Sequence, residues 1–481
     1  MSTPQIFKNW LENRDLEIRE GRIRSAKRAL LERLEAGPLP RNVATELAAL
    51  CRRTGLFRHS LLLLHKYVRA DRGSAQLATD AERVEYAGAL AQIGAEEEAL
   101  QLLHSIPDSG PAQALLFQAF ALFTRWDYAS AIPLLERYVA RPDLSDYPRL
   151  IGKVNLAASL VAERRSEEAS ELISALLAEI GPEKVLLRGN LLEISAQGEI
   201  HRKNWKRAEA LLDEAQSLLS GEDAPDFFFV EKWRSILSGL TAPGRAVFDK
   251  LREHAFERGH WETLRECDLY RGLALGDARP LERCYFGTPY ASYRERILRM
   301  SGLELSRAHF DWSPIKSGPL LLDLRQPPEL KPGQLIDRTL RFLASDFYRP
   351  RHWASLHASL FPDRHLNPIT SANTVHQAIK RTRKWLDENA PGVGILEIDG
   401  CYRLTTSKPG SIRVEAQVKS GHEIRIEQLH KSGQSEFSAR DAASIWDVEK
   451  HTALRLIKEF LAKGRLTQTG SGPATRYLLA P

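Results

Sequence analysis

The sequence predicts a mainly α-helical protein: a solenoid of stacked helix pairs, followed by two small α+β domains. Residues 40–220 are rich in Ala, Leu, Glu and Arg, show no strand-like alternation, and repeat one apolar pattern five times. Further along, a basic amphipathic helix followed by a hairpin signal occurs twice. We therefore expect helical repeats over 1–240, a bridging region over 241–330, α+β domains over 331–406 and 422–481, and a linker over 407–421.

Length and charge agree with this division. A chain of 481 residues is too long for one hydrophobic core and indicates several domains. The net charge of +6 is uneven, because residues 331–481 hold 23 Lys and Arg against 15 Asp and Glu, a net of +8. The first 330 residues therefore carry a net of −2. Only the C-terminal part is expected to meet a polyanion, although a solvated basic surface would give the same balance.

Three positions define the helical repeat. Each copy has a small residue, a second small residue twelve positions later, and a large apolar residue four further on. The first small residues are Ala48, Ala87, Ala119, Ala157 and Ala196, the second are Ser60, Ala99, Ala131, Ala169 and Ala208, and the apolar residues are Leu64, Leu103, Leu135, Ile173 and Leu212. Small residues let two helices cross closely, and the larger residue fills the next groove.

This pattern resembles the tetratricopeptide repeat, although its spacing wanders between 32 and 39 residues. Turns between helices are expected at Gly94-Ala95, at Trp126-Asp127-Tyr128 and at Asn204-Trp205. Stacked helix pairs leave a long concave face, which usually binds peptide or protein. The resemblance therefore implies a protein partner bound through the repeats. The alternative is an array that only spaces or dimerises the C-terminal half.

Residues 241–330 are expected to bridge the two halves. Residues 245–275 look helical. Short strands are predicted at 310–314 and 320–324, and the prolines that follow mark a boundary, namely Pro327, Pro328 and Pro332.

The first α+β domain is predicted to be a winged helix, with helices at 333–344 and 352–361, a third helix capped by Thr370-Ser371, and a hairpin over 395–404. At 100° per residue, the inward side of the third helix carries Val375, Ile379, Thr382 and Leu386. The outward side and its flanks carry Asn373, His376, Gln377, Lys380, Arg381, Arg383 and Lys384. A basic helix followed by a wing is an arrangement that meets the major groove, so we predict DNA contact here over a merely solvated face.

The spacing Val375-x3-Ile379-x-Arg381-x-Arg383-x2-Leu386, followed by Gly400-x-Tyr402-Arg403-Leu404, resembles the OmpR/PhoB-type winged-helix effector domain. That domain also occurs in bacterial activators that carry tetratricopeptide-like repeats. The resemblance implies that the third helix enters the major groove, where Gln377 and Arg381 face bases and Asn373, Lys380 and Arg383 hold phosphates. The wing departs from the family, because Glu397 and Asp399 make it acidic. Either the wing stands clear of DNA, or this copy docks protein.

A second winged helix is predicted over 422–481. Its helices are expected at 424–430, at 439–445 with Ser438 as N-cap, and at 449–463. In the last helix the predicted inward residues are Leu454, Ile457 and Leu461, and the predicted outward residues are Lys450, His451, Thr452, Arg455 and Lys458. The following hairpin carries Arg476 and resembles the wing of a common bacterial module. Because this wing is uncharged or basic, DNA contact is favoured over protein contact.

Sequence patterns typical of catalysis and metal binding are absent. The four cysteines are scattered without CxxC spacing, which suits reduced thiols in a cytoplasm. No P-loop, dinucleotide fingerprint or HExxH motif occurs, so we expect no enzyme activity, no cofactor and no bound metal.

No run approaches the ~20 apolar residues of a membrane span, and the first 24 residues lack the apolar stretch of a signal peptide. The sequence therefore predicts a cytoplasmic protein without a membrane partner.

Together these patterns predict a DNA-binding transcriptional regulator. Helical repeats would bind or sense a protein partner, and tandem winged helices would bind double-stranded DNA. A homodimer would suit repeated half-sites in the DNA. The alternative hypothesis is a non-enzymatic scaffold or adaptor in which the winged helices mediate protein assembly. The acidic first wing favours that alternative.

Overall fold

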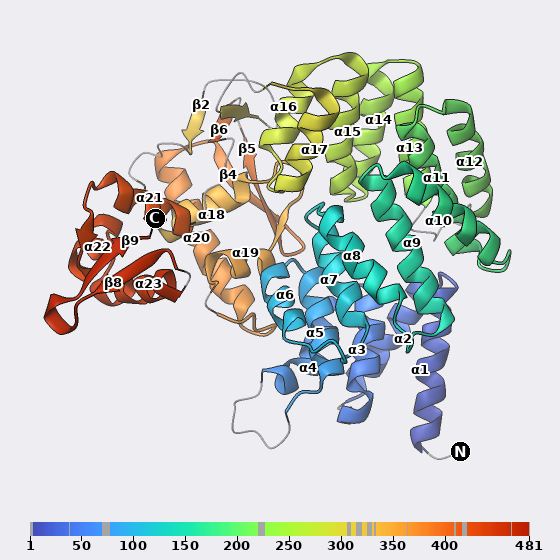
Figure 1. Ribbon diagram of the computed structural model, residues 1–481, viewed down its shortest axis with the longest axis horizontal. Helices are drawn as coiled ribbons and strands as arrows, with labels where there is room; N and C mark the ends of the chain where they lie inside the picture. The colour runs from blue at the N-terminus through green and yellow to red at the C-terminus, as the bar shows by residue number, and fades with distance from the viewer. Residues whose placement is uncertain are drawn as a thin grey trace. The chain divides into compact units, whose positions relative to one another are not determined.

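The computed structural model confirms the predicted fold class of helical repeats followed by two small α+β winged-helix domains (Figure 1). The structure describes residues 3–37, 39–69, 77–219, 227–304, 309–313, 320–324, 330, 333–362, 364–407, 410–415, 421–462 and 464–480. The prolines predicted to mark a boundary, Pro327, Pro328 and Pro332, lie outside these residues.

The repeats are pairs of neighbouring helices. The pairs are α1 (Thr3–Arg19) with α2 (Ile23–Glu35), α3 (Ala44–Arg53) with α4 (Phe57–Val68), α5 (Asp80–Gln92) with α6 (Glu96–His104), α7 (Gln113–Phe123) with α8 (Tyr128–Val139), α9 (Asp146–Ala162) with α10 (Ser166–Glu179), and α11 (Val185–His201) with α12 (Trp205–Leu218). The five predicted copies correspond to the pairs from α3–α4 to α11–α12. In each copy the first small residue lies on the first helix and the second small residue on the second helix.

All fifteen predicted repeat positions are buried, which confirms the pattern. The second small residue is at most 1% exposed in every copy, so the two helices of a pair leave no room there for a longer side chain. The large apolar residue four positions later is also buried in each copy. The buried positions of each helix pair can therefore be identified directly from the sequence repeat.

Each of these five pairs turns through one residue in the left-handed backbone region, at Gly55, Gly94, Trp126, Arg164 and Lys203. The next residue donates its N–H to a carbonyl five residues upstream, as Asp127 does to Leu122 at 3.0 Å. A non-glycine residue in this region costs on the order of 1 kcal/mol. Packing between the helices, and not local preference, therefore fixes the turns at Trp126, Arg164 and Lys203.

Replacing Ala131 with Leu is expected to destabilise the protein by about 1–3 kcal/mol, because the extra carbons enter a closely packed helix crossing. Urea unfolding measures the change in the free energy of unfolding. Ala129, which is exposed on the same helix α8, supplies the matched control Ala129→Leu, expected to be nearly neutral. Equal effects of the two substitutions would contradict the close crossing.

Helices continue beyond the predicted repeats as α13 (Phe227–Thr241), α14 (Arg245–Glu257), α15 (Trp261–Leu275), α16 (Ala278–Phe286) and α17 (Ala291–Ser301). The helical stretch predicted at 245–275 is thus two helices, α14 and α15. They turn at Gly259 in the same left-handed conformation, and His260 donates its N–H to Ala255 at 2.8 Å. The architecture of the repeats therefore extends into the region that the sequence suggested was a bridge.

Helices distant in the sequence meet inside this stack. Trp126, at the α7–α8 turn, donates its indole N–H to Glu262 on α15 at 2.7 Å. Its ring packs edge-on against Tyr293 of α17, with centroids 4.5 Å apart. Arg296, also on α17 and only 8% exposed, lies over the same indole at 5.2 Å. The turn between α7 and α8 therefore packs against α15 and α17, although these helices are far apart in the sequence.

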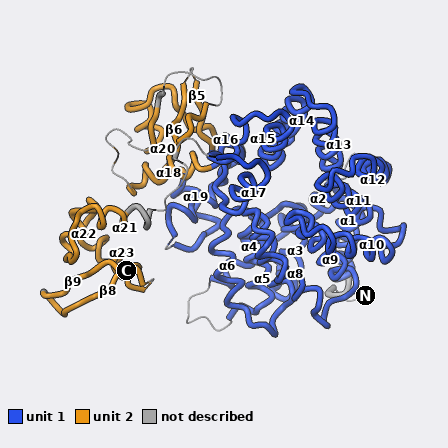
Figure 2. Tube along the Cα trace, turned by 45° about the horizontal axis from the view of Figure 1, so that its top comes forward, with its two compact units in different colours: residues 1–306, 346–375, 397–402 blue, residues 307–345, 376–396, 403–481 orange. Residues whose placement is uncertain are grey.

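The chain forms two compact units, which Figure 2 distinguishes by colour. The first, here called the repeat unit, consists of residues 1–306, 346–375 and 397–402. The second, here called the C-terminal unit, consists of residues 307–345, 376–396 and 403–481. The first winged helix contributes residues to both units.

The two winged helices have the same order of elements. The first comprises α18 (Leu335–Ala344), β3 (Arg351–His352), α19 (Trp353–Leu360), α20 (Ser371–Asn389), β4 (Val393–Ile398) and β5 (Cys401–Thr406). The second comprises α21 (Gly421–Lys431), β7 (Glu436–Phe437), α22 (Ala439–Trp446), α23 (Lys450–Ala462), β8 (Leu466–Thr469) and β9 (Arg476–Leu479). The last strand lies in the middle of each sheet, in the orders β3-β5-β4 and β7-β9-β8.

A third small sheet joins segments on either side of the first winged helix. The strands predicted after residue 309 are present as β1 (His309–Trp312) and β2 (Leu320–Asp323). Between them lies β6 (Ser411–Glu415), which is antiparallel to β1 and parallel to β2. Arg413 on β6 bonds both carboxylate oxygens of Asp311 on β1, at 2.6 and 3.0 Å.

The core of the second winged helix corrects one prediction about α23. Leu454 was expected to face inward, but it is 37% exposed. The buried stripe consists of Ala453, Leu456, Ile457 and Phe460. Ala453 and Phe460 are seven positions apart, which is two helical turns, and the stripe that they define with Ile457 leaves Leu454 at its edge. Ser438 caps α22 as predicted, in a capping box with Asp441.

Candidate nucleic-acid interface

Helix α20 of the first winged helix has a buried side and an exposed polar side. Its predicted inward residues are all buried, namely Val375, Ile379, Thr382 and Leu386. The hydroxyl of Thr382 donates to the Ala378 carbonyl at 2.9 Å, so this polar residue is satisfied on the buried side. Five predicted contact residues are exposed: Asn373, Gln377, Lys380, Arg381 and Lys384.

The exposed cations of α20 are little neutralised. Lys384 lies 3.9 Å from Glu388, and both side chains are largely exposed, so this pair contributes little. Lys380 and Arg381 have no ion pair with any residue that the structure describes. The outward face of α20 therefore keeps its positive charge available for an anion.

Arg383 is placed differently from the other cations of α20. Its side chain is half-buried, and its guanidinium donates from Nε and Nη2 to the Ile395 carbonyl of β4, at 3.2 and 2.9 Å. Two of its five N–H donors thus brace the helix against the wing. The resemblance implied a phosphate contact for Arg383, and the structure adds a bracing contact that the sequence did not predict.

The wing turns tightly at Asp399-Gly400, where both residues have positive φ, 50° and 73°. This two-residue connection between β4 and β5 matches the Asp-Gly preference of tight hairpins. The strand before the turn exposes Leu396, Glu397 and Ile398, of which Ile398 is 58% exposed. The tip is therefore acidic, as its sequence suggested, and it is also apolar and offers no cation to a phosphate.

The second winged helix also presents predicted cations. Lys450, His451, Arg455, Lys458 and the wing residue Arg476 are exposed, and Thr452 is half-buried. Arg455 is partly neutralised, because its Nη1 lies 2.7 Å from Glu459 one turn later. Thr452 and His451 share a hydrogen bond of 3.3 Å. This surface is basic but more self-paired than that of α20.

Arg425, on α21, adds positive charge that the sequence did not single out. Its Nη2 donates to the Gly333 carbonyl at 3.4 Å. Burial, and after it the nearby cations Arg338 and Arg455, lower the pKa of its guanidinium to about 10. The C-terminal unit thus gathers cations from α18, α21 and α23 around one half-buried guanidinium.

The segment that precedes α20 is packed into the repeat unit, which the sequence did not indicate. Asp346 bonds Arg265 of α15, Phe347 donates its N–H to the Gly287 carbonyl at 3.1 Å, and the Tyr348 hydroxyl donates to Asp268 at 2.6 Å. Further along, α19 packs against α6. A Cβ added to Gly94 would collide with the hydroxyl of Ser355 on α19.

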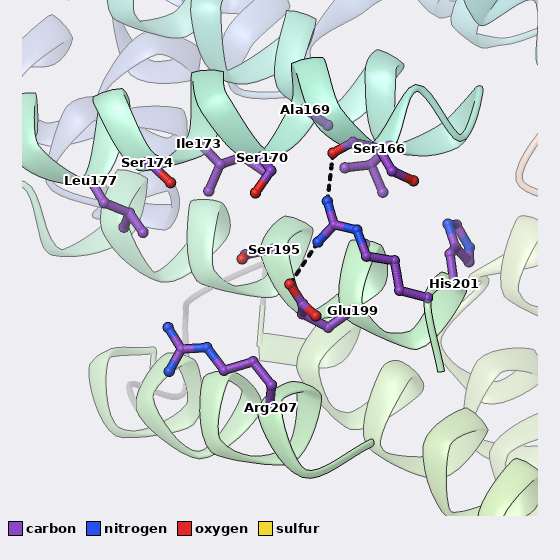
Figure 3. Close-up of a pocket in the computed structure, with 13 residues that line it drawn as sticks. Ser166, Ala169, Ser170, Ile173, Ser174, Leu177, Ser195, Glu199, His201 and Arg207 are labelled. Carbon is purple, nitrogen blue, oxygen red and sulfur yellow. Dashed lines mark hydrogen bonds and ion pairs between the residues drawn. The ribbon is translucent and has the colours of Figure 1, made fainter. Parts of the chain in front are cut away.

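A small cleft lies between the fourth and fifth predicted repeats, lined mainly by α10 and α11 (Figure 3). Arg202 lines the cleft and donates to Glu199 at 2.7 Å and to the Ser166 carbonyl at 2.5 Å. Arg207, from α12, lines another side. The volume of the cleft, ≈ 120 Å³, is well below the roughly 300–1,000 Å³ of small-molecule sites, so the cleft is suited to a few water molecules.

Among the residues that the structure describes, no group of three or more His, Cys, Asp or Glu side chains could hold a metal ion. None of the helices that are described is both long and apolar enough to cross a membrane.

Solved structures that resemble this chain include two with little sequence identity to it. A structure named MamA MSR-1 C2 is 16% identical with a TM-score of 0.28, over 37% of this chain and 95% of that one. A Rap protein complexed with competence and sporulation factor is 12% identical with a TM-score of 0.41, over 79% of this chain and 98% of that one. No protein-family model matches the sequence, and no curated protein matches it. At these similarities, the conclusion that the repeats are tetratricopeptide-like depends on the helix pairs themselves.

Proposed function

We propose that the chain binds double-stranded DNA and acts as a transcriptional regulator, without catalysing a reaction. One observation carries this proposal. The outward face of α20 exposes Gln377, Lys380 and Arg381, while the opposite face is buried and a wing follows directly. A helix held in this way can lie in a major groove, where an Arg bonded to guanine is the commonest specific contact.

The exposed residues divide into two roles. Gln377 and Arg381 have the side chains that read base edges, an amide for adenine and a guanidinium for guanine. Asn373, Lys380 and Lys384 would bond phosphates and so set the register of the helix on the duplex. Arg383 would serve mainly to brace the wing, because its guanidinium already bonds the Ile395 carbonyl.

The second winged helix would add a second, weaker contact. Its exposed cations lie on α23 and, as Arg476, on its wing. Unlike the wing of the first domain, this wing is not acidic. Two modules on one chain raise each other's effective concentration, so neither needs high affinity alone. The helical repeats would bind a protein partner, as stacked helix pairs commonly do. A homodimer and a cytoplasmic location remain predictions from the sequence.

A protein scaffold is the second candidate, and the first wing favours it. Leu396 and Ile398 are exposed beside Glu397, and an acidic, apolar tip suits a protein surface better than a phosphate. In that account the winged helices and repeats would all serve assembly. The two candidates differ in salt dependence, since phosphate contacts make affinity fall steeply as salt rises.

Replacing Arg381 with Ala is expected to weaken duplex binding about tenfold, because one charged contact to a base is lost. Fluorescence anisotropy with a labelled duplex, enriched by the native protein from a random pool, measures the dissociation constant. Lys206→Ala, which removes an exposed cation from α12 of the repeats, is the matched control and should leave affinity unchanged. Failure to enrich any duplex, or equal affinities for the two variants, would favour the scaffold.

A further inference from the structure

The polypeptide just before α20 is held by side chains of the repeats. Leu366 is completely buried, and its N–H donates to a carboxylate oxygen of Glu98 on α6 at 2.9 Å. The carbonyl of the same residue accepts a longer bond from the Tyr86 hydroxyl of α5, at 3.5 Å. Both backbone groups of Leu366 are therefore satisfied by residues about 270 to 280 positions away, all within the repeat unit.

Glu98 is arranged to keep that bond. Only 8% of the residue is exposed, and its two oxygens have separate partners. Oε1 pairs with Arg69 of the repeats and lies 3.5 Å from Nδ1 of His365, which leaves Oε2 for the Leu366 amide. A buried carboxylate fixed by a cation on one side is a strong acceptor on the other.

A series of hydrogen bonds connects the rest of this loop to the start of α20. The side-chain oxygen of Asn367 accepts the N–H groups of Ile369 and Thr370, at 2.8 and 3.2 Å. The hydroxyl of Ser371, the first residue of α20, accepts the N–H of Asn367 at 3.0 Å. Arg58 of α4 donates to the Pro368 carbonyl at 3.2 Å. Any shift at Leu366 would therefore be passed to the start of α20.

We propose that Glu98 is a positioning residue for DNA binding, which fixes the start of α20 through the Leu366 amide. This inference rests on the proposed function, because it assigns a role in the same interface to a residue of the repeats. Glu98 touches no DNA. It sets where α20 begins, six residues before Gln377, and a contact helix must be held to within about half an ångström to bind well. A partner that displaces α6 would thereby alter DNA binding.

The test compares Glu98→Ala with the conservative Glu98→Gln and with a neighbour. Glu98→Ala removes the acceptor for Leu366, whereas Glu98→Gln keeps an oxygen there. Glu97→Gln is the matched control, because Glu97 is exposed on the same helix and pairs with Arg125 instead of the loop. Arg58→Ala is a second, exposed probe of the same loop should Glu98→Ala not fold. Each variant is measured for hydrogen exchange of residues 364–372 and for affinity to the enriched duplex.

The proposal predicts about tenfold faster exchange in this loop and roughly threefold or greater loss of duplex affinity for Glu98→Ala. Glu98→Gln should restore most of the affinity, and Glu97→Gln should match the native protein. Faster exchange with unchanged affinity, while Arg381→Ala still loses binding, would overturn the positioning role and leave the proposed function standing. If Arg381→Ala also binds normally, the proposed function itself is wrong and no positioning role for DNA binding survives.

Discussion

Replacing Arg265 with Met is expected to lower the free energy of unfolding by about 3–5 kcal/mol, because it leaves a buried carboxylate without its cation. Arg265 is completely buried on α15, and its Nη2 lies 3.0 and 3.2 Å from the two oxygens of Asp346. Its other donors reach Glu262 at 3.0 Å and Thr288 at 2.6 Å. Burial opposes the charged form of Asp346, yet Arg265 holds the pKa of that carboxyl below its ordinary value.

Chemical unfolding of three variants separates the charge from the packing. Arg265→Met combined with Asp346→Asn removes both charges and should recover part of the loss. Arg258→Met, which breaks an exposed pair with Glu231, should cost about 0–1 kcal/mol. A cost for Arg265→Met no larger than that of Arg258→Met would contradict the buried pair.

The protein is expected to lose stability steeply as the pH falls from 6.5 towards 4. Burial lowers the pKa of His201 to about 3 and the pKa of His352 and of His357 to about 4. In the unfolded chain an imidazole titrates near 6.5. Over this window the unfolded chain binds protons that the folded chain does not, so the free energy of unfolding falls with pH. At pH 5 the cost is about 2 kcal/mol for each of His201 and His352, and His357 acts in the same direction.

Calorimetry at pH 7.5, 6 and 5 measures this loss, in a range where most carboxylates remain charged. His201→Gln removes one of the titrating groups and should flatten the dependence by about one proton. His201 contacts the Tyr270 hydroxyl at 3.2 Å, so this variant is compared with itself at pH 7.5 to separate the lost contact from the titration. A melting temperature that stays constant from pH 7.5 to 5 would show that these imidazoles are not buried neutral.

The local parts of the fold could be predicted from the sequence. Within each copy two small residues lie twelve positions apart because close helix crossings allow little else, and all five pairs fold as that spacing indicates. The inward side of α20 was also predictable, since Val375, Ile379 and Leu386 follow the helical period. In α23 the same reasoning misplaced Leu454. This residue lies at the edge of the buried stripe, where an apolar side chain can be either buried or exposed.

The long-range contacts of the fold, among them those between residues 346–375 and the helical repeats, could not be predicted from the sequence. Glu98 and Leu366 are 268 positions apart, and a backbone N–H leaves no mark in a sequence. The pairing of β6 with β1 joins residues that are 102 positions apart, as the Asp311–Arg413 bonds show. Nothing in the sequence distinguishes Asp346 and Arg265 from exposed charged residues, and only the fold buries them together. Such long-range pairs depend on the whole packing arrangement and carry no periodic signal.

The proposed function depends on the exposed face of α20. The sequence indicated its cations, and the structure leaves Lys380 and Arg381 exposed on a helix whose other side is buried. The bracing contact of Arg383 could not be predicted, because its bond to the Ile395 carbonyl forms only when helix and hairpin pack together.

Site-specific photo-crosslinking tests the contact between α20 and DNA most directly. A photoreactive residue placed at Gln377, with Lys206 of the repeats as the control position, is irradiated with the enriched duplex, and the products are mapped to single nucleotides. The proposed function predicts crosslinks from position 377 to bases of the major groove and none from position 206. Crosslinks from position 377 to protein alone, with the duplex untouched, would contradict DNA binding by α20 and favour the scaffold.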